Sequence, residues 1–199
     1  MEISFGNKIA IADCNIYNKK NKTMQKAHLY ELNCNSRSDI SYLYNKKGDD
    51  WIFGADILNN MQQKCDYLKY QIEPEERKQW LKDSKYYILE SNRNILGACE
   101  AVYSKNDVRI NYLTSIDKKD YKYIGSAILG AITAHNLREN GGTTLIPLPT
   151  PKSYKFYQNA CGFSPNIETP IALKHENPKS FIEKLKNKIQ LRLRHPKKN

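Results

Sequence analysis

The chain has 199 residues, of which 40% are hydrophobic and 27% charged, so we expect one soluble domain that is long enough to bury a substantial core. No apolar run of about 18 residues predicts a membrane-spanning helix, and the first residues do not resemble a secretory signal peptide. The formal net charge of +11 predicts an acidic partner, which charge alone does not identify.

The cysteine pattern indicates a reducing compartment, and we expect a cytoplasmic protein. The five cysteines are odd in number and widely spaced, without a CxxC pair: Cys14, Cys34, Cys65, Cys99 and Cys161. This pattern argues against a disulfide framework and a structural zinc site, and no other residue group has metal spacing, so we predict no metal. The abundance of Lys, Asn, Ile and Tyr is typical of an AT-rich genome, such as that of a bacterium living in a host. Secretion into a host cell is not readable from the sequence.

The first part of the chain predicts both strands and helices. Loose alternation of apolar and polar residues predicts one or two strands within residues 3–17 and another over 27–32. Apolar residues at helical spacing predict helices over 40–44 and 52–70. Pro74, followed by acidic residues, predicts the start of a further helix.

Three strands with turn-forming residues between them are predicted in the middle of the chain. Their ranges are 86–90, 95–103 and 108–115. The Ser-Asn-Arg-Asn sequence before Ile95 and the Ser-Lys-Asn-Asp sequence before Val108 each favour a hairpin turn. Two consecutive hairpins predict an antiparallel meander.

The pattern then changes from strand to helix. A basic loop leads to Gly125, and an Ala/Ile/Leu-rich stretch predicts a helix from Ser126. An apolar run at 145–148 predicts another strand, and the next predicted helix carries Phe156 and Tyr157. Antiparallel strands that lead into a helix and a further strand predict an α+β fold with a mixed sheet.

The turn before the first of these helices suits a phosphate group. Gly125, Ser126 and Ala127 follow one another at the helix start, where backbone N–H groups are free and small residues allow close approach. Lysines in the preceding loop add positive charge: Lys118, Lys119 and Lys122. The turn therefore predicts a site for a phosphorylated ligand.

The spacing of these residues resembles that of the GCN5-related N-acetyltransferases, the GNAT superfamily. Leu113, Ser115 and Asp117 occupy the positions of a Leu-x-Val-x-Pro motif. Gly125 occupies the last glycine of the basic Gln/Arg-x-x-Gly-x-Gly/Ala loop that follows. Tyr157 lies 32 residues after Gly125, where the family carries a tyrosine shortly before Gly-Phe. The resemblance implies a central, mostly antiparallel twisted sheet flanked by helices.

Several positions depart from the family pattern. Ser115 and Asp117 replace Val and Pro, Asp120 replaces the Gln or Arg, and Tyr123 replaces the first glycine of the loop. Four residues, instead of the usual three, separate Tyr157 from the following Gly-Phe, which indicates an extra residue at the helix end. These departures leave a second interpretation open: a GNAT fold that no longer catalyses and serves as a binding or regulatory module.

The resemblance implies acetyl-CoA as the co-substrate and direct attack of an amine on the acetyl group, without an acyl-enzyme. It places these residues against the cofactor: Leu113, Ser115, Lys122, Tyr123, Ile124, Gly125, Ser126 and Ala127. In the family the strand end over 112–116 is splayed from its neighbour, so the amide of Ser115 would polarise the thioester oxygen. Tyr157 would protonate the leaving thiolate, with Tyr154 as a competitor one turn earlier.

The amine must also lose a proton, and Glu100 is the first candidate for the base. It is flanked by apolar residues on a strand predicted to be central, and burial would raise its pKa toward the useful range. If Tyr103 pairs with Val108, Glu100 faces Asn111, close to the acceptor site. A glutamate hydrogen-bonded within the sheet is an equally good interpretation. His135, on an apolar helical stripe, is more typical of a core histidine than of a catalyst.

Residues 176–199 predict a basic amphipathic helix and tail. Pro178 and Ser180 suit a helix start. The apolar stripe consists of Phe181, Ile182, Leu185, Ile189 and Leu193. The simpler interpretation is a final helix packed on the domain with a solvated basic face. The alternative is binding of an anionic partner: a membrane surface, an inositol phosphate or RNA.

We therefore expect one GNAT-like domain over 1–175, with an acyl-CoA-binding core over 95–163 and a divergent part, 1–90, on the acceptor side. The predicted activity is an acetyl-CoA-dependent N-acetyltransferase acting on a small-molecule or protein amine, such as a protein lysine or N-terminus. The basic surface also suits a bacterial effector or toxin. An inactive GNAT-fold module and, less favoured, a nucleic-acid-binding protein stay open.

Overall fold

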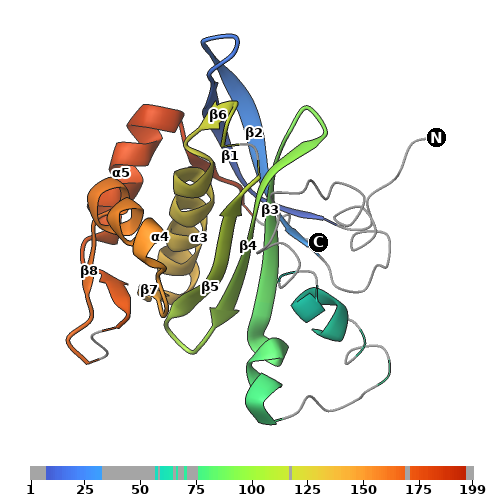
Figure 1. The fold of residues 1–199 in the computed structure, drawn as a ribbon, viewed down its shortest axis with the longest axis vertical. Helices are drawn as coiled ribbons and strands as arrows, with labels where there is room; N and C mark the ends of the chain where they lie inside the picture. Colours follow the sequence, from blue (N-terminus) through green and yellow to red (C-terminus); the bar gives the residue numbers. More distant parts are fainter. Residues whose placement is uncertain are drawn as a thin grey trace.

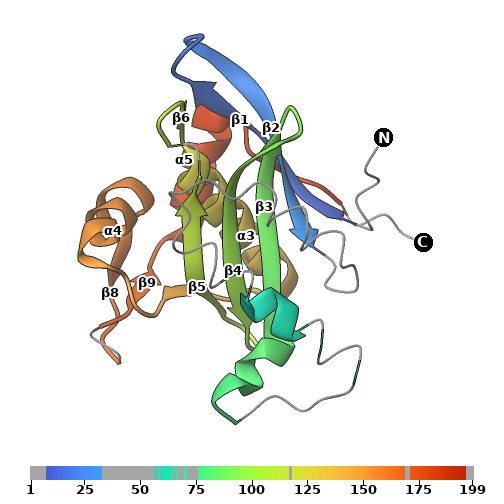
Figure 2. The same cartoon turned by 45° about the vertical axis from the view of Figure 1, so that its right-hand side comes forward.

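The computed structural model describes residues 8–32, 57, 59–64, 66, 70, 76–116, 118–168 and 171–195. The described strands join in one sheet, with helices against it (Figure 1, Figure 2). The strands are β1 (Ile9–Asn18), β2 (Thr23–Leu32), β3 (Ser84–Ser91), β4 (Asn94–Tyr103), β5 (Val108–Ser115), β6 (Tyr121–Lys122), β7 (Thr144–Ile146), β8 (Phe163–Pro165), β9 (Leu173–His175) and β10 (Arg192–Leu193). The helices with complete bounds are η1 (Glu76–Asp83), α3 (Ile124–Asn140), α4 (Pro151–Lys155), η2 (Phe156–Ala160) and α5 (Pro178–Ile189). None of the helices in the described ranges is long and apolar enough to cross a membrane.

The sheet is mixed, as the sequence predicts. Its strands follow the order β10-β1-β2-β3-β4-β5-β7-β9-β8, and β6 pairs with β1 outside this path. The β5–β7 pair is parallel, whereas the other described pairs are antiparallel. The predicted meander is confirmed in β3, β4 and β5, including the pairing of Tyr103 with Val108. The α+β fold is therefore confirmed.

Helix α3 crosses from β6 back to β7 and is buried on most of its sides. The sheet covers one side and α5 packs on another, which explains why its sequence is apolar nearly all round. Gly130 lets α5 come close, because a Cβ there would lie 2.1 Å from Cδ1 of Leu185. The helix ends at Gly141, which has a left-handed φ of 64° and donates its N–H to the carbonyl of Leu137 at 3.2 Å.

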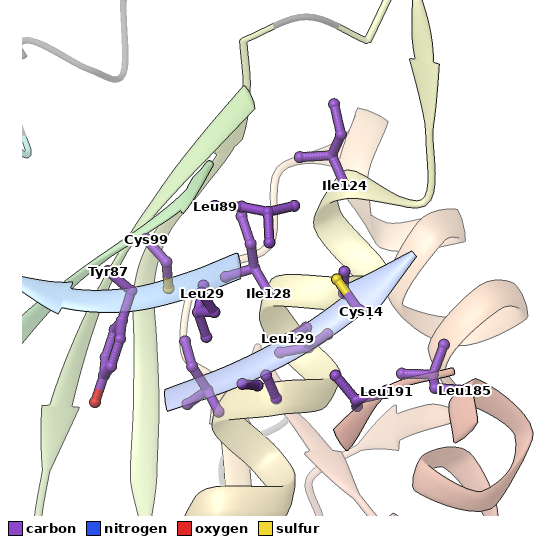
Figure 3. Close-up of a cluster of buried hydrophobic side chains, with 14 of the residues drawn as sticks. Cys14, Leu29, Tyr87, Leu89, Cys99, Ile124, Ile128, Leu129, Leu185 and Leu191 are labelled. Atoms are coloured by element: carbon purple, nitrogen blue, oxygen red, sulfur yellow. The ribbon is translucent and has the colours of Figure 1, made fainter. Parts of the chain in front are cut away.

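Two cores lie on opposite faces of the sheet. In the main core, Cys14 of β1 and Leu29 of β2 pack with Ile128 of α3 and with residues of α5 (Figure 3). The second, smaller core holds these buried residues: Leu32, Ile57, Met61, Tyr86, Ile88, Ile95 and Ala98. Helical residues between 57 and 66 thus cover the face that α3 and α5 leave open.

Helix α5 buries most of the stripe that its sequence predicts. The buried members are Phe181, Ile182, Leu185 and Ile189. The helix ends there because Gln190 turns the chain with a left-handed φ of 51°. Leu193, which we predicted to continue the helical stripe, lies instead in β10 and pairs with Ala12 of β1. The prediction of a helix through residue 193 is therefore wrong.

Several predicted boundaries also move. Residues 3–17 contribute one described strand, β1, and the strand predicted over 27–32 already begins at Thr23. The helix predicted from Pro74 is a 3₁₀ helix that starts at Glu76. Within 52–70 the described residues are helical, whereas the helix predicted over 40–44 lies outside the described residues.

The boundaries in the second half shift less. Helix α3 starts at Ile124, two residues before the predicted Ser126, because the backbone bonds of its first turn begin at Tyr123. The strand predicted over 145–148 is β7 and ends at Ile146.

Candidate active site

Strand β5 loses β7 as a neighbour after its first residues. On that side β7 pairs with β5 at two positions in the described chain, Val108 with Thr144 and Arg109 with Leu145. Strand β5 nevertheless continues to Ser115 on its pairing with β4. The second half of β5 therefore has backbone groups that β7 does not use, which is the splay that the resemblance implies.

The amide of Ser115 points to this splayed side. The N–H of the next residue, Ile116, donates to the carbonyl of Leu96 at 2.8 Å, on the β4 side. Because successive N–H groups point in opposite directions along a strand, the N–H of Ser115 points away from β4. The N–H of Ser115 is therefore a backbone donor on the side of β5 away from β4.

The start of α3 lies directly beside this strand end. Its first helical bond runs from the N–H of Ala127 to the carbonyl of Tyr123 at 2.8 Å, so the N–H groups of the first three helical residues have no partner within the helix. Gly97 of β4 lets this turn approach the sheet, because a Cβ there would lie 2.6 Å from Cγ2 of Ile124. Gly125 likewise lies close to a ring, since a Cβ there would be 3.2 Å from Cζ of Phe156.

These elements enclose a cavity of about 420 Å³. It is lined by eight residues that the sequence predicts for the site: Leu113, Ser115, Lys122, Tyr123, Ile124, Gly125, Ser126 and Tyr157. It is also lined by Lys118, Tyr121, Ser153, Phe156 and Ala160. A larger cavity of about 890 Å³ lies between α3, α5 and β10 and has none of the predicted residues in its lining.

Sequence reasoning did not assign most of the additional lining residues to the site. Ser153 lies one helical turn before Tyr157, so helical spacing could have identified it. Phe156 reaches the cavity because Gly125 leaves room for its ring, a contact that no local pattern reveals. Ala127 shows the opposite case: its side chain is buried in the main core and its N–H is used inside the helix, so it does not line the cavity.

Tyr157 is the aromatic residue expected at the thiolate. Its ring packs edge-on against two others, with 5.2 Å between the ring centroids for Phe156 and 5.9 Å for Phe163. Burial raises the pKa of Tyr157 above its ordinary value, and the nearby thiols of Cys99 and Cys161 raise it further. The phenol therefore stays protonated at neutral pH. Tyr154, the competitor, does not line the cavity.

The extra residue before the Gly-Phe pair is taken up by a π-helical turn. This turn, η2, spans Phe156–Ala160 and contains Tyr157. A π turn holds one more residue than an α turn, which accounts for the four residues between Tyr157 and Gly162. Gly162 then ends the helix with a left-handed φ of 74°, and its N–H donates to the backbone carbonyl of Gln158 at 3.0 Å.

Glu100 does not reach the cavity. It is fully buried and accepts hydrogen bonds from Nδ2 of Asn60 at 2.9 Å and Nδ2 of Asn111 at 3.1 Å. It pairs with Tyr86 of β3, whose side chain belongs to the second core, so Glu100 lies on the face covered by Ile57 and Met61. The sheet separates it from Tyr157.

The predicted register at Glu100 is also wrong by one residue. Its strand partner is Tyr112, because a bulge between Glu100 and Ala101 leaves Asn111 outside the regular pairing. The side chain of Asn111 still turns back to bind the Glu100 carboxylate.

Basic residues lie beside the loop that leads to α3. Strand β6 pairs with β1, and Lys19 from the β1–β2 turn donates its Nζ to the carbonyls of Lys118 at 2.6 Å and Lys119 at 3.0 Å. Lys122 lies with its Nζ 5.6 Å from the ring centroid of Tyr17. His135 lies elsewhere on α3, where its Nδ1 meets the guanidinium of Arg138.

Known structures share this architecture. The chain is similar to a mutant of the toxin AtaT bound to the C-terminus of the antitoxin AtaR and to acetyl-CoA, with 13% identity, a TM-score of 0.51, and coverage of 81% of this chain and 96% of that chain. It is also similar to a protein described as a GNAT-family acetyltransferase from Desulfovibrio desulfuricans, with 14% identity, a TM-score of 0.47, and coverage of 74% of this chain and 94% of that chain. A third similar structure is the N-acetyltransferase PseH from Campylobacter jejuni, with 14% identity, a TM-score of 0.42, and coverage of 74% of this chain and 94% of that chain.

No family model matches the sequence, and no curated protein matches it either. The similarity is therefore one of structure: the chain has the fold of the AtaT toxin, in agreement with the α+β fold that the sequence resemblance implies.

Proposed function

We propose that this chain, whose fold is that of the GNAT acetyltransferases, is an acetyl-CoA-dependent N-acetyltransferase acting on a primary amine. The observation that carries the proposal is the cavity beside β5, which brings the start of α3, Ser115 and Tyr157 together. A helix start suits phosphate groups, and Lys118 and Lys122 add positive charge in the cavity wall. The AtaT complex of similar fold contains acetyl-CoA, which supports the choice of cofactor.

In the proposed reaction the amine nitrogen attacks the thioester carbonyl carbon, so an amide C–N bond forms and the C–S bond breaks. The N–H of Ser115 stabilises the negative charge that develops on the carbonyl oxygen. Tyr157 gives its phenolic proton to the leaving thiolate, and the amine loses a proton to a base. No covalent intermediate with the protein is needed.

Glu100 is the base that we propose, acting from the other face of the sheet. Because it lies outside the cavity with Asn60 and Asn111 against its carboxylate, the proton would pass through water. Replacing Glu100 with Gln should remove the rise of turnover with pH. An unchanged pH profile would exclude Glu100 as the base.

The first experiment measures acetyl-CoA binding by thermal stability and calorimetry. A ligand at about 100 times its Kd adds about 2.7 kcal/mol to the free energy of unfolding. No stabilisation by acetyl-CoA would exclude both the cofactor and the enzyme. Binding would be followed by a screen of protein and small-molecule amines with detection of the released thiol.

A GNAT-fold module that binds without catalysing is the second candidate. The observation that favours it is Tyr123, which occupies the loop position of a family glycine and has a left-handed φ of 73°. Acetyl-CoA binding without thiol release for every amine tested would support this module. Thiol release that depends on Tyr157 would exclude it.

A further inference from the structure

A tyrosine stands where the backbone favours glycine. Tyr123, directly before α3, has φ 73° and ψ 8°, a left-handed conformation that is unfavourable for residues with a Cβ. No side-chain hydrogen bond caps the helix start there. Its carbonyl nevertheless accepts the first helical bond, from Ala127. The conformation of Tyr123 therefore sets the direction of the free N–H groups at the start of α3.

The ring of Tyr123 is held by a distant part of the chain. Lys188, in the last turn of α5, places its Nζ 4.6 Å from the ring centroid, within cation–π range. The ring also packs against the main core. Helix α5 is fixed on α3 through buried Leu185, which fits against Gly130. Lys188 therefore has a defined position relative to the helix start.

The lysines around the loop have different relations to the cavity. Lys118 and Lys122 line it, whereas Lys188 is absent from its lining. Lys188 reaches the cavity wall through the ring of Tyr123. This arrangement suits an indirect role, in which the lysine fixes the ring and the ring fixes the turn.

We propose that Tyr123 and Lys188 form a brace that takes the place of the loop glycine and holds the turn in its cofactor-binding conformation. Lys188 is thus a positioning residue that acts through Tyr123. The inference rests on the proposed function, because the ligand is the pyrophosphate part of acetyl-CoA. It also assigns α5 a role in supporting the cofactor site.

A double-mutant cycle tests the brace. The acetyl-CoA Kd is measured by calorimetry for the wild type, Lys188→Met, Tyr123→Gly and the double variant. Methionine keeps the length of the lysine side chain but removes its charge. We expect Lys188→Met to weaken binding by about two- to fivefold, from the usual strength of an exposed cation–π contact. In the Tyr123→Gly background the same substitution should have no effect, since glycine adopts the left-handed turn by itself.

The matched control is Lys179→Met, which removes the same charge at the other end of α5 and should leave the Kd unchanged. Equal losses from Lys188→Met in both backgrounds would overturn the brace and indicate a direct contact with phosphate. No loss in either background would also overturn it. If the wild type does not bind acetyl-CoA, the proposed function fails, and hydrogen exchange at the amides of residues 124–127 tests the brace alone. Faster exchange in Lys188→Met supports the brace, and unchanged exchange excludes it.

Discussion

Tyr157 combines a buried ring with a place in the cavity wall. Its neighbours Phe156 and Phe163 exclude water from the ring, and this burial raises the pKa of the phenol. Burial keeps the phenol in the protonated form that a proton donor needs, and it also makes the phenol a weaker acid, so the role that we propose rests on the place of Tyr157 in the cavity wall and not on its pKa.

We expect Tyr157→Phe to lower kcat by roughly 100-fold, the lower range for loss of a general acid. The acetyl-CoA Kd should stay nearly the same, because phenylalanine keeps the ring packing. Single-turnover kinetics and calorimetry separate the two quantities. Tyr154→Phe serves as the control, and a comparable fall of kcat in that variant would assign the acid role to Tyr154 instead.

His175 makes the stability of the fold sensitive to acid. Its ring is buried between two aromatic rings, and its centroid lies 4.5 Å from that of Phe163 and 5.1 Å from that of Phe181. Burial lowers the pKa of His175 below its ordinary value of 6.5, an effect that the Cys161 backbone partly offsets. The folded state therefore binds the proton less well than the unfolded state, and the free energy of unfolding falls as the pH drops below about 6.5.

The matching experiment follows urea denaturation between pH 7.5 and pH 5. We expect His175→Phe to lose less stability over this range than the wild type. Burial also lowers the pKa of His135. The His175→Phe variant should therefore still lose part of its free energy of unfolding as the pH falls. If the free energy of unfolding depends on pH in the same way for the wild type and for His175→Phe, His175 does not contribute to the acid sensitivity.

Two glycines in different elements let α3 pack tightly on both of its sides. Because Gly130 has no side chain, α5 can pack closely against α3. Because Gly97 has none, the first turn of α3 can pack closely against the sheet. At Gly97 a Cβ would meet the backbone carbonyl of Thr114 at 2.7 Å as well as the Ile124 side chain at 2.6 Å. A backbone atom inside the sheet cannot move aside as a side chain can.

Gly97→Ala should therefore destabilise the fold by about 2 kcal/mol, as expected for an overpacked core. It should also weaken acetyl-CoA binding, because α3 starts next to this position. Chemical denaturation and calorimetry measure the two effects. Asn94→Ala, at the exposed start of the same strand, is the control and should change neither. Wild-type stability in Gly97→Ala would show that the helix can shift at little cost.

The sequence identifies the elements whose signals are local. The turn residues before Ile95 and Val108 predict the meander, and the spacing of Ser115, Gly125 and Tyr157 predicts three residues of the cavity wall. These signals come from turn chemistry and from residue spacing, which can be read without knowing which strands pair.

Features that depend on distant pairing are not predicted. The bulge that displaces Asn111 is visible only once β4 and β5 pair, and it changes the partner of Glu100. The left-handed Tyr123 and its contact with Lys188 join residues far apart in sequence. Glu100 is buried, as we expected, but its face of the sheet follows from the register of the whole sheet rather than from its neighbours in sequence.

At the scale of the whole molecule, the sheet is closed on one side by a strand from the far end of the chain. Strand β10 pairs with β1 through Ala12 and Leu193. Next to this pair, Arg194 donates two hydrogen bonds to Asp13, at 2.6 and 2.8 Å. The short strand thus covers the backbone edge of β1 at Ala12 and Asp13, which would otherwise be open to other strands, while β6 pairs with the same edge at Tyr17 and Asn18.

Ending the chain at Ile189 should expose this edge, lower stability and promote association. Size-exclusion chromatography and denaturation measure the two results. Arg194→Gln removes the exposed ion pair with Asp13 but keeps the strand, so it should have little effect. A truncated chain that stays monomeric and fully stable would show that β10 does not protect the edge.

The β1–β10 pairing also imposes an order on folding during synthesis. Asp13 and Arg194 are 181 residues apart, so β1 leaves the ribosome long before its last partner is made. Until then β1 can pair with β2 along one edge and with β6 at Tyr17 and Asn18 on the other edge, whereas the part of that second edge at Ala12 and Asp13 stays open. Closing so large a loop is slow and entropically costly, which makes it a late step. We therefore expect the nascent chain to pass through a stage in which most of the sheet exists and β1 still lacks a partner at Ala12 and Asp13.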